Sequence, residues 1–488
     1  MPLQIISYKF TKSNNLIFNY LNSSHMKISI NAFKAVIILL LAAPFKSFAT
    51  HNRAGEIQVE YIDNLTRRAT IFTYTKASSL PADRTQLVIN WGDGTIDSIK
   101  RSNNNGELLP NDVKKNVYTF THRYDKFGNY TISSMDPNRN GGILNVNYPQ
   151  SDVAAFYIQT SIIVSATLKN STPILLNAPI DRGIVGVPFK HVINPFDSED
   201  DSIAYRLITP MMDFNTPVNL YEFPDKIRPG INNKITLNEV TGELTWNSPQ
   251  QAGEYAIAIK VISYRNSVAI DSTVRDMQIL IEGRTGILPE IGTEVPKLVE
   301  VKAGQEVFLV LKSKIQQDAN GKLFKLIATG GAFEVTNNKA EFNNNKGYQT
   351  ATSDSFRWKV TEEHARKMPY MIVFKLEDNT FESAGLANYY VLQIKVNSLA
   401  SKTQELDNQS LKTFPNPAQE AITLDFDGKN EPIKIDVLDV TGRTVFSTQL
   451  KNQHTYILKK ENIGKGLFWV RAYFEKSNTV AIKKVVFE

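Results

Sequence analysis

The sequence of 488 residues contains no cysteine, which excludes disulfide bonds, thiolate zinc sites and a cysteine nucleophile. Its six histidines are scattered and form no H-E-x-x-H or H-x-H pattern, so zinc chemistry has no support. The G-x-S-x-G and phosphate-binding glycine motifs are also missing. We therefore predict that the protein is not an enzyme. A glycosidase pair of carboxylates formed across loops stays open, because no sequence pattern reveals it.

Long apolar runs are scarce as well. The run from Ala35 to Ala43 follows two lysines and is too short to span a bilayer as a helix. Ser47-Phe48-Ala49 then places small residues where a signal peptidase reads them. We predict that residues 1–49 are a secretory signal peptide with an effective start near Met26 and cleavage after Ala49.

Excess charge is also absent from the exported chain. The formal net charge is +6, but residues 1–49 contain five lysines and no acidic residue, which leaves +1 for the remainder. A chain so close to neutral presents no electrostatic case for nucleic-acid binding.

What the sequence does contain is short stretches of alternating apolar and polar residues between Asn- and Gly-rich turns. This pattern predicts an all-β protein, and the remaining 440 or so residues suggest three or four domains. The single helix that we expect covers Thr361–Met368, capped by Thr361 and stopped by Pro369.

The first predicted module covers residues 50–170. Trp91-Gly92-Asp93-Gly94-Thr95 follows an apolar strand, and its glycines and Asp93 favour a tight turn. A structural turn explains Asp93 and Asp97 better than a metal or catalytic pair, and Trp91 and Trp246 are expected to be core residues. The segment resembles the PKD-type β-sandwich.

The second predicted module covers residues 171–283. Tyr255, Ile257, Ile259 and Val261 share one face of a strand with period two, and Arg275–Ile281 is expected to be a final edge strand. With Thr241–Trp246, these motifs resemble the Ig-like or cadherin-like repeats of bacterial surface proteins. Residues 294–397 are predicted to be a β-sandwich of unassigned family, and residues 398–411 a flexible linker. The implied fold class is tandem immunoglobulin-like β-sandwich domains with a small C-terminal β-sandwich.

The last stretch, residues 412–488, resembles the type A sorting domain of the type IX secretion system of Bacteroidota. Four motifs occur in order and at the terminus: Phe414–Pro417, Ile435–Arg443, Gly464–Val470 and Lys483-Lys484. The residues that we assign to the sorting motif are Pro415, Asn416, Pro417, Gly442, Gly466, Lys483 and Lys484. The resemblance implies export through the periplasm to the outer-membrane surface or the medium. It also implies contact with the secretion machinery and an outer-membrane polysaccharide or lipopolysaccharide anchor.

The acidic loop is the best candidate for a metal site. It contains the carboxylates of Asp197, Glu199, Asp200 and Asp201, which repel one another unless a cation or solvent screens them. Hard oxygen ligands suit Ca²⁺, and in the cadherin-like resemblance such a loop is often a calcium site. A solvated turn is the alternative, because the loop departs from the usual D-x-D-G-D spacing.

These observations predict a non-catalytic, adhesive or structural protein of the cell surface or medium, with a glycan or protein ligand that the sequence does not identify. The alternative is a secreted carbohydrate-active hydrolase or its carbohydrate-binding accessory. A concave pocket with two free carboxylates, or an exposed aromatic platform, would favour that alternative.

Overall fold

The computed structural model describes residues 52–79, 83–292, 296–314, 321–381, 384–399, 405–406, 411–426, 432–451, 453–474 and 479–488. The predicted signal peptide and most of the predicted linker lie outside these residues. The described chain is built from β-strands, and its α-helices are the single turns α3 (Pro224–Ile227) and α4 (Gly331–Glu334). The all-β prediction is confirmed.

The helix expected over Thr361–Met368 is wrong. Only a 3-10 turn, Glu362–His364, forms there, with Thr361 and His364 in a capping box. The backbone N–H groups of Lys367 and Met368 donate to the Asp200 carboxylate. They are therefore not available for helical hydrogen bonds, and the chain leaves the turn in an extended conformation.

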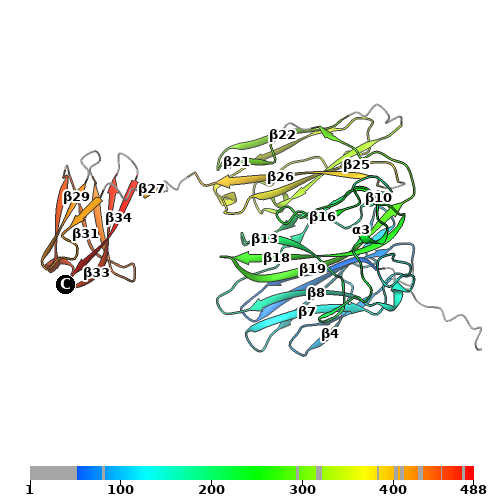
Figure 1. The fold of residues 1–488 in the computed structure, drawn as a ribbon, viewed down its shortest axis with the longest axis horizontal. Helices are drawn as coiled ribbons and strands as arrows, with labels where there is room; N and C mark the ends of the chain where they lie inside the picture. The colour runs from blue at the N-terminus through cyan, green and yellow to red at the C-terminus, as the bar shows by residue number, and fades with distance from the viewer. Residues whose placement is uncertain are drawn as a thin grey trace, which may run out of the picture.

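The largest sheet has fourteen strands and follows the order β4-β3-β7-β8-β19-β1-β2-β6-β5, with further strands branching from it (Figure 1). Its strands are β1 (Asn52–Tyr61), β2 (Thr66–Lys76), β3 (Gln86–Asn90), β4 (Ile96–Lys100), β5 (Glu107–Leu109), β6 (Val113–Arg123), β7 (Gly128–Asp136), β8 (Phe156–Val164), β10 (Arg182–Ile184), β13 (Ser202–Ile208), β14 (Met211–Asp213), β15 (Thr216–Pro217), β18 (Gly253–Arg265) and β19 (Val268–Glu282).

Strand β19 joins the strands of this sheet that precede residue 170 to those that follow it. It forms a hairpin with β18 through Asn266 and Ser267, whose φ angles of 52° and 65° match a type I′ turn. It also pairs with β8 and β1, which precede residue 170. The expectation that Arg275–Ile281 is an edge strand is therefore wrong. The division at residues 170 and 171 stays a prediction about sequence modules, and one continuous sheet contains strands from both sides of it.

Smaller sheets complete this region. The apolar core beside β18 and β19 contains Trp246, which is 1% exposed and meets the edge of Tyr255 with 4.8 Å between ring centroids. Trp91 is fully buried in the neighbouring core, so both tryptophans are core residues as predicted. The small sheets pair β9 (Ile174–Leu175) with β12 (Pro195–Phe196) and place β17 (Glu243–Trp246) between β11 (Phe189–Val192) and β16 (Ile235–Leu237).

Residues 291–397 form two sheets around one apolar core, as expected of a sandwich. Val307 and Trp358 on one sheet and Ile372 and Leu392 on the other are buried in that core. The first sheet contains β20 (Ile291–Gly292), β22 (Glu306–Ser313) and β24 (Ser353–Lys359), and the second contains β21 (Leu298–Lys302), β26 (Ala387–Asn397), β25 (Tyr370–Asp378) and β23 (Phe324–Gly330).

The C-terminal residues form a second small sandwich, drawn in orange and red in Figure 1. Its core gathers apolar residues such as Leu411, Leu424, Val437 and Val470 from both sheets. The larger sheet follows the order β27 (Glu405–Leu406), β34 (Thr479–Phe487), β33 (Gly466–Phe474), β30 (Lys434–Leu438) and β31 (Thr444–Gln449), and the smaller sheet contains β28 (Leu411–Phe414), β29 (Ala421–Phe426) and β32 (Thr455–Lys459).

Candidate functional sites

The acidic loop lies between β12 and β13, and two of its carboxylates are bound by arginines. Asp201 accepts hydrogen bonds from Arg265 Nε and Nη2 at 2.7 and 2.6 Å. Asp200 accepts one from Arg366 Nε at 3.0 Å, and from the next two backbone N–H groups at 2.6 and 2.8 Å. Asp200 therefore fastens this loop to a segment more than 160 residues further along the chain.

Asp197 and Asp271 are buried acids for which the described residues supply no ion pair. They are 3% and 5% exposed, and one oxygen of each has no hydrogen-bond partner. Burial raises the pKa of Asp197 to about 7 and that of Asp271 to about 6, and the nearby carboxylates of Asp201 and Glu199 add to both shifts. Asp271 lies 70 residues from the loop in sequence, so no local pattern linked it to this loop.

The four predicted ligands do not converge on one point. Asp200 and Asp201 face different arginines, and Glu199 accepts hydrogen bonds from Ser171 N and Ser198 Oγ. Among the described residues, no group of three or more acidic or histidine side chains is arranged to hold a metal ion. Calcium binding by Asp197, Glu199, Asp200 and Asp201 stays a prediction.

The raised pKa of Asp197 predicts an unusual pH dependence of stability. An unfolded aspartate titrates near about 4, so between pH 4 and 7 the folded protein holds a proton that the unfolded chain releases. This contribution to stability is complete below about pH 4 and is lost as the pH rises through about 7. The side chain of the Asp197→Asn variant is neutral at every pH. In EDTA the free energy of unfolding of this variant should exceed that of the parent by roughly 1–3 kcal/mol at pH 8 and by much less at pH 5.

Melting temperatures of parent and variant at both pH values test this prediction. An equal difference at pH 5 and pH 8 would contradict it. Repeating the series with calcium tests the metal prediction, because a bound cation would stabilise the ionised parent at pH 8 and reverse the advantage of the variant.

The Trp91–Thr95 turn is held by its own side chains and by side chains of the neighbouring strands β4 and β6. The Asp93 carboxylate accepts hydrogen bonds from Thr95 N and from His122 Nε2, at 2.9 and 2.7 Å. Asp97 accepts from Trp91 Nε1 at 2.8 Å, and the His122 ring stacks on Trp91. These contacts give both aspartates structural roles in the turn, in agreement with the expectation from the sequence.

A second acid–histidine pair is fully internal. His191 Nδ1 lies 2.7 Å from Asp181 Oδ2, and the two side chains are 0% and 2% exposed. Lys375 contacts both Asp181 and Glu377, at 2.9 and 2.8 Å, and the Tyr389 hydroxyl donates to Asp181. This group joins residues 181–191 to the following sandwich. His191 and Asp181 are thus enclosed by the packing of these segments.

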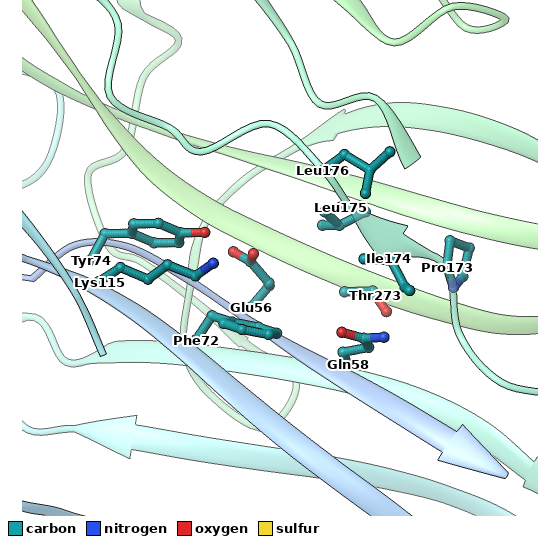
Figure 2. Close-up of a pocket in the computed structure, with 10 residues that line it drawn as sticks. All are labelled: Glu56, Gln58, Phe72, Tyr74, Lys115, Pro173, Ile174, Leu175, Leu176 and Thr273. Carbon is teal, nitrogen blue, oxygen red and sulfur yellow. The ribbon is translucent and has the colours of Figure 1, made fainter. Parts of the chain in front are cut away.

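A small pocket lies where β1, β2 and β6 meet the segment 173–176. Figure 2 shows the ends of Tyr74, Lys115 and Glu56 pointing toward one another beside the Phe72 ring. The cavity measures about 140 Å³, below the roughly 300–1,000 Å³ of typical ligand pockets. Arg275 binds both oxygens of the Glu56 carboxylate at 3.1 and 2.6 Å. Glu56 is therefore part of a buried ion pair.

In the C-terminal sandwich, Asn416 of the predicted sorting motif fastens the last strand. Its Nδ2 donates to Lys484 O at 2.6 Å, and its Oδ1 accepts from Val486 N at 2.9 Å. The backbones of Ala418 and Val486 are hydrogen-bonded alongside. The Asn416 amide thus replaces two backbone hydrogen bonds of a missing neighbour strand, and Pro415 and Pro417 flank it at the entry of the domain.

The two glycines of the motif occupy backbone positions that disfavour other residues. Gly442 has a φ of 82° and lies in the turn after β30, where Asp439 accepts hydrogen bonds from Thr441 N and Arg443 N. Gly466 has a φ of 139° at the start of β33. Both positions favour glycine because a Cβ would be strained there.

The basic pair of the motif divides between the two faces of its sheet. Lys483 is opposite the buried Val470, whereas Lys484 is opposite the exposed Trp469. Asn416, Gly442 and Gly466 thus shape the fold, and Lys484 presents its side chain to solvent.

Comparison with known proteins identifies the tail. Residues 412–488 match the family model of the secretion system C-terminal sorting domain, which confirms the predicted sorting domain over the same residues. No curated protein matches the chain. Export to the cell surface or extracellular space follows from this domain. None of the helical segments among the described residues has the length and hydropathy of a membrane span.

Solved structures give only weak likenesses. Zebrafish RET cadherin-like domains 1 to 4 align over 83% of this chain and 93% of theirs, with 9% identity and a TM-score of 0.14. The human Desmocollin-1 ectodomain aligns over 91% and 78%, with 12% identity and a TM-score of 0.18. Sidekick-1 immunoglobulin domains 1–5 align over 89% of this chain and 80% of theirs, with 10% identity and a TM-score of 0.16. Scores this low add nothing to the all-β architecture described above.

Proposed function

We propose that this protein is a non-catalytic adhesive or structural component of the cell surface, displayed after export through its sorting domain. The sheets ahead of the tail would present loops to a glycan or protein ligand. The secretion machinery would read residues 412–488, and a surface polysaccharide or lipopolysaccharide would retain the exported chain.

The observation that carries this proposal is the position of the side chains capable of acid–base chemistry. The Asp181–His191 pair is buried, the Asp93–His122 pair holds a turn, and Glu56 is bound by Arg275. A hydrolase needs such groups free and facing a substrate. These three acids are engaged with basic side chains, and the two acids without an ion pair among the described residues, Asp197 and Asp271, are only 3% and 5% exposed, which supports a scaffold instead.

Deleting residues 412–488 tests the sorting role. We expect the truncated protein to accumulate inside the cell, and fractionation with antibody detection measures its distribution. Undiminished arrival of the truncated protein at the surface would contradict the role. For the adhesive role, a mutant strain lacking the whole protein should attach less well to surfaces, with complementation as the control.

Asn416→Ala is the matched point variant. It removes both side-chain hydrogen bonds to the last strand, and we expect the C-terminal sandwich to lose about 1–3 kcal/mol of stability. The exported fraction should fall with that loss. Asn462→Ala, at an exposed position in the same domain, is the control. Equal stability of the two variants would contradict a stabilising role for the two hydrogen bonds between Asn416 and the last strand.

A groove favours the carbohydrate-binding part of the alternative over the hydrolase part. It runs across β7, β8, β18 and β19 and measures about 390 Å³. Thr131, Ser161 and Ser272 occupy directly opposed positions on three adjacent strands, and Lys260 and Tyr264 also line the groove. Hydroxyl groups in a row suit a saccharide, and a glycan array would identify one. Turnover of a chromogenic sugar would favour the hydrolase.

A further inference from the structure

The five-stranded sheet of the C-terminal sandwich has an outer face with a row of side chains that reach solvent, in which Trp469 and Lys484 are exposed and Leu438 is half-buried. Leu438, Trp469 and Lys484 are directly opposed on β30, β33 and β34. Trp469 is 43% exposed, although its neighbours in sequence, Phe468 and Val470, are buried in the core. A large aromatic side chain therefore lies open to solvent in the middle of a sheet.

The charges around this row are mostly positive. Arg471 and Lys434 lie on the same face, and both form ion pairs with the buried Asp436, which also accepts hydrogen bonds from Ser447 and Tyr473. Lys484 is exposed on the same row. The face thus combines an exposed tryptophan with cations that Asp436 only partly balances.

The sorting role of residues 412–488 indicates a function for this face. Asn416, Gly442 and Gly466 are engaged in holding the fold, so a receptor must read other side chains that reach solvent. Tryptophan and arginine are the residues most enriched at the energetic centres of protein interfaces, and exposed apolar patches with polar rims mark binding surfaces. We propose that the face formed by Leu438, Trp469 and Lys484 is the surface by which the secretion machinery recognises the tail, with Trp469 as its anchor.

The partner that fits is a protein component of that machinery with an apolar recess for the Trp469 ring and an acidic rim for Lys484 and Arg471. The inference rests on the sorting role of residues 412–488 and goes beyond it by naming the surface. The other face of the sandwich supplies a comparison. Ile457 is 59% exposed on β32, and Lys459 follows it on the same strand.

Export of full-length variants from the native host tests the proposal. Trp469→Ala should weaken recognition by about thirtyfold, as expected for an interface anchor, and so strongly lower the exported fraction. Lys484→Glu should lower the exported fraction less than Trp469→Ala does, and Trp469→Phe should retain most of the parent's export. Ile457→Ala and Lys459→Glu are the matched controls, and both should be exported like the parent.

Folding of the tail is checked separately, by the melting temperature and protease resistance of each purified full-length variant. Reduced export of Trp469→Ala with parent-like stability supports the proposal. Normal export of Trp469→Ala overturns it, and so does a larger defect in Ile457→Ala. Loss of export that merely follows loss of stability also overturns it. If deletion of residues 412–488 leaves export intact, the sorting role itself fails, which is a different result.

Discussion

Replacing Lys375 with methionine is expected to destabilise the protein ahead of its tail by about 3–5 kcal/mol. The ammonium group lies 2.9 Å from Asp181 and 2.8 Å from Glu377, and both carboxylates are at most 4% exposed. Burial alone would lower the pKa of Lys375, but the two carboxylates outweigh it and raise the pKa. Methionine fills a similar volume, leaves Glu377 buried without a cation, and leaves Asp181 with only His191 beside it.

Calorimetry of the full chain measures the loss. Lys312→Met, at an exposed position of β22, is the control and should change stability by less than about 0.5 kcal/mol. Combining Lys375→Met with Asp181→Asn and Glu377→Gln should recover part of the loss, because no uncompensated charge then stays buried. A parent-like melting temperature for the single variant would contradict this account of the junction.

The sequence predicted the parts of this protein that depend on short-range pattern. Alternation in Tyr255–Val261 predicted a strand, and the glycines around Asp93 predicted a turn, because both follow from residues that are neighbours in the chain. The sorting motif was recognisable because the hydrogen bonds to its last strand and the turns between its strands need particular residues. Asn416 and Gly442 are examples of positions where few substitutes would serve.

Contacts between distant segments were not predictable from pattern. Asp200 meets Arg366 across 166 residues, and no local signal indicates which arginine binds which acid. One signal was available for β19. This strand is buried almost throughout and yet contains Asp271, Arg275 and Asp276. Charged residues in such a strand require partners, which argues against an edge position.

Arg139→Met is expected to have an effect as large as that of Lys375→Met. The Arg139 guanidinium donates to both Asp276 oxygens at 3.0 and 2.5 Å, and also to Met211 O and Ala155 O at 3.1 Å each. Its ring contact is with Phe156, at 5.2 Å. Removing one member of such a buried pair costs about 3–5 kcal/mol, so the melting temperature should fall by roughly 8–15 °C in a unit of this size.

The variant also tests whether residues 52–282 unfold as one unit. Arg139 precedes the predicted boundary at residue 170, and Met211 and Asp276 follow it, so a single transition should shift. Burial raises the pKa of Asp276 even beside Arg139, and without Arg139 a proton must neutralise this carboxyl. The destabilisation should therefore be smaller at pH 5 than at pH 8. Arg68→Met breaks the half-exposed pair with Glu60 and should cost less than about 1 kcal/mol. A loss of stability confined to a separate early transition would show that the two halves of the sheet fold independently. A loss of stability that does not depend on pH would show that Asp276 finds another partner.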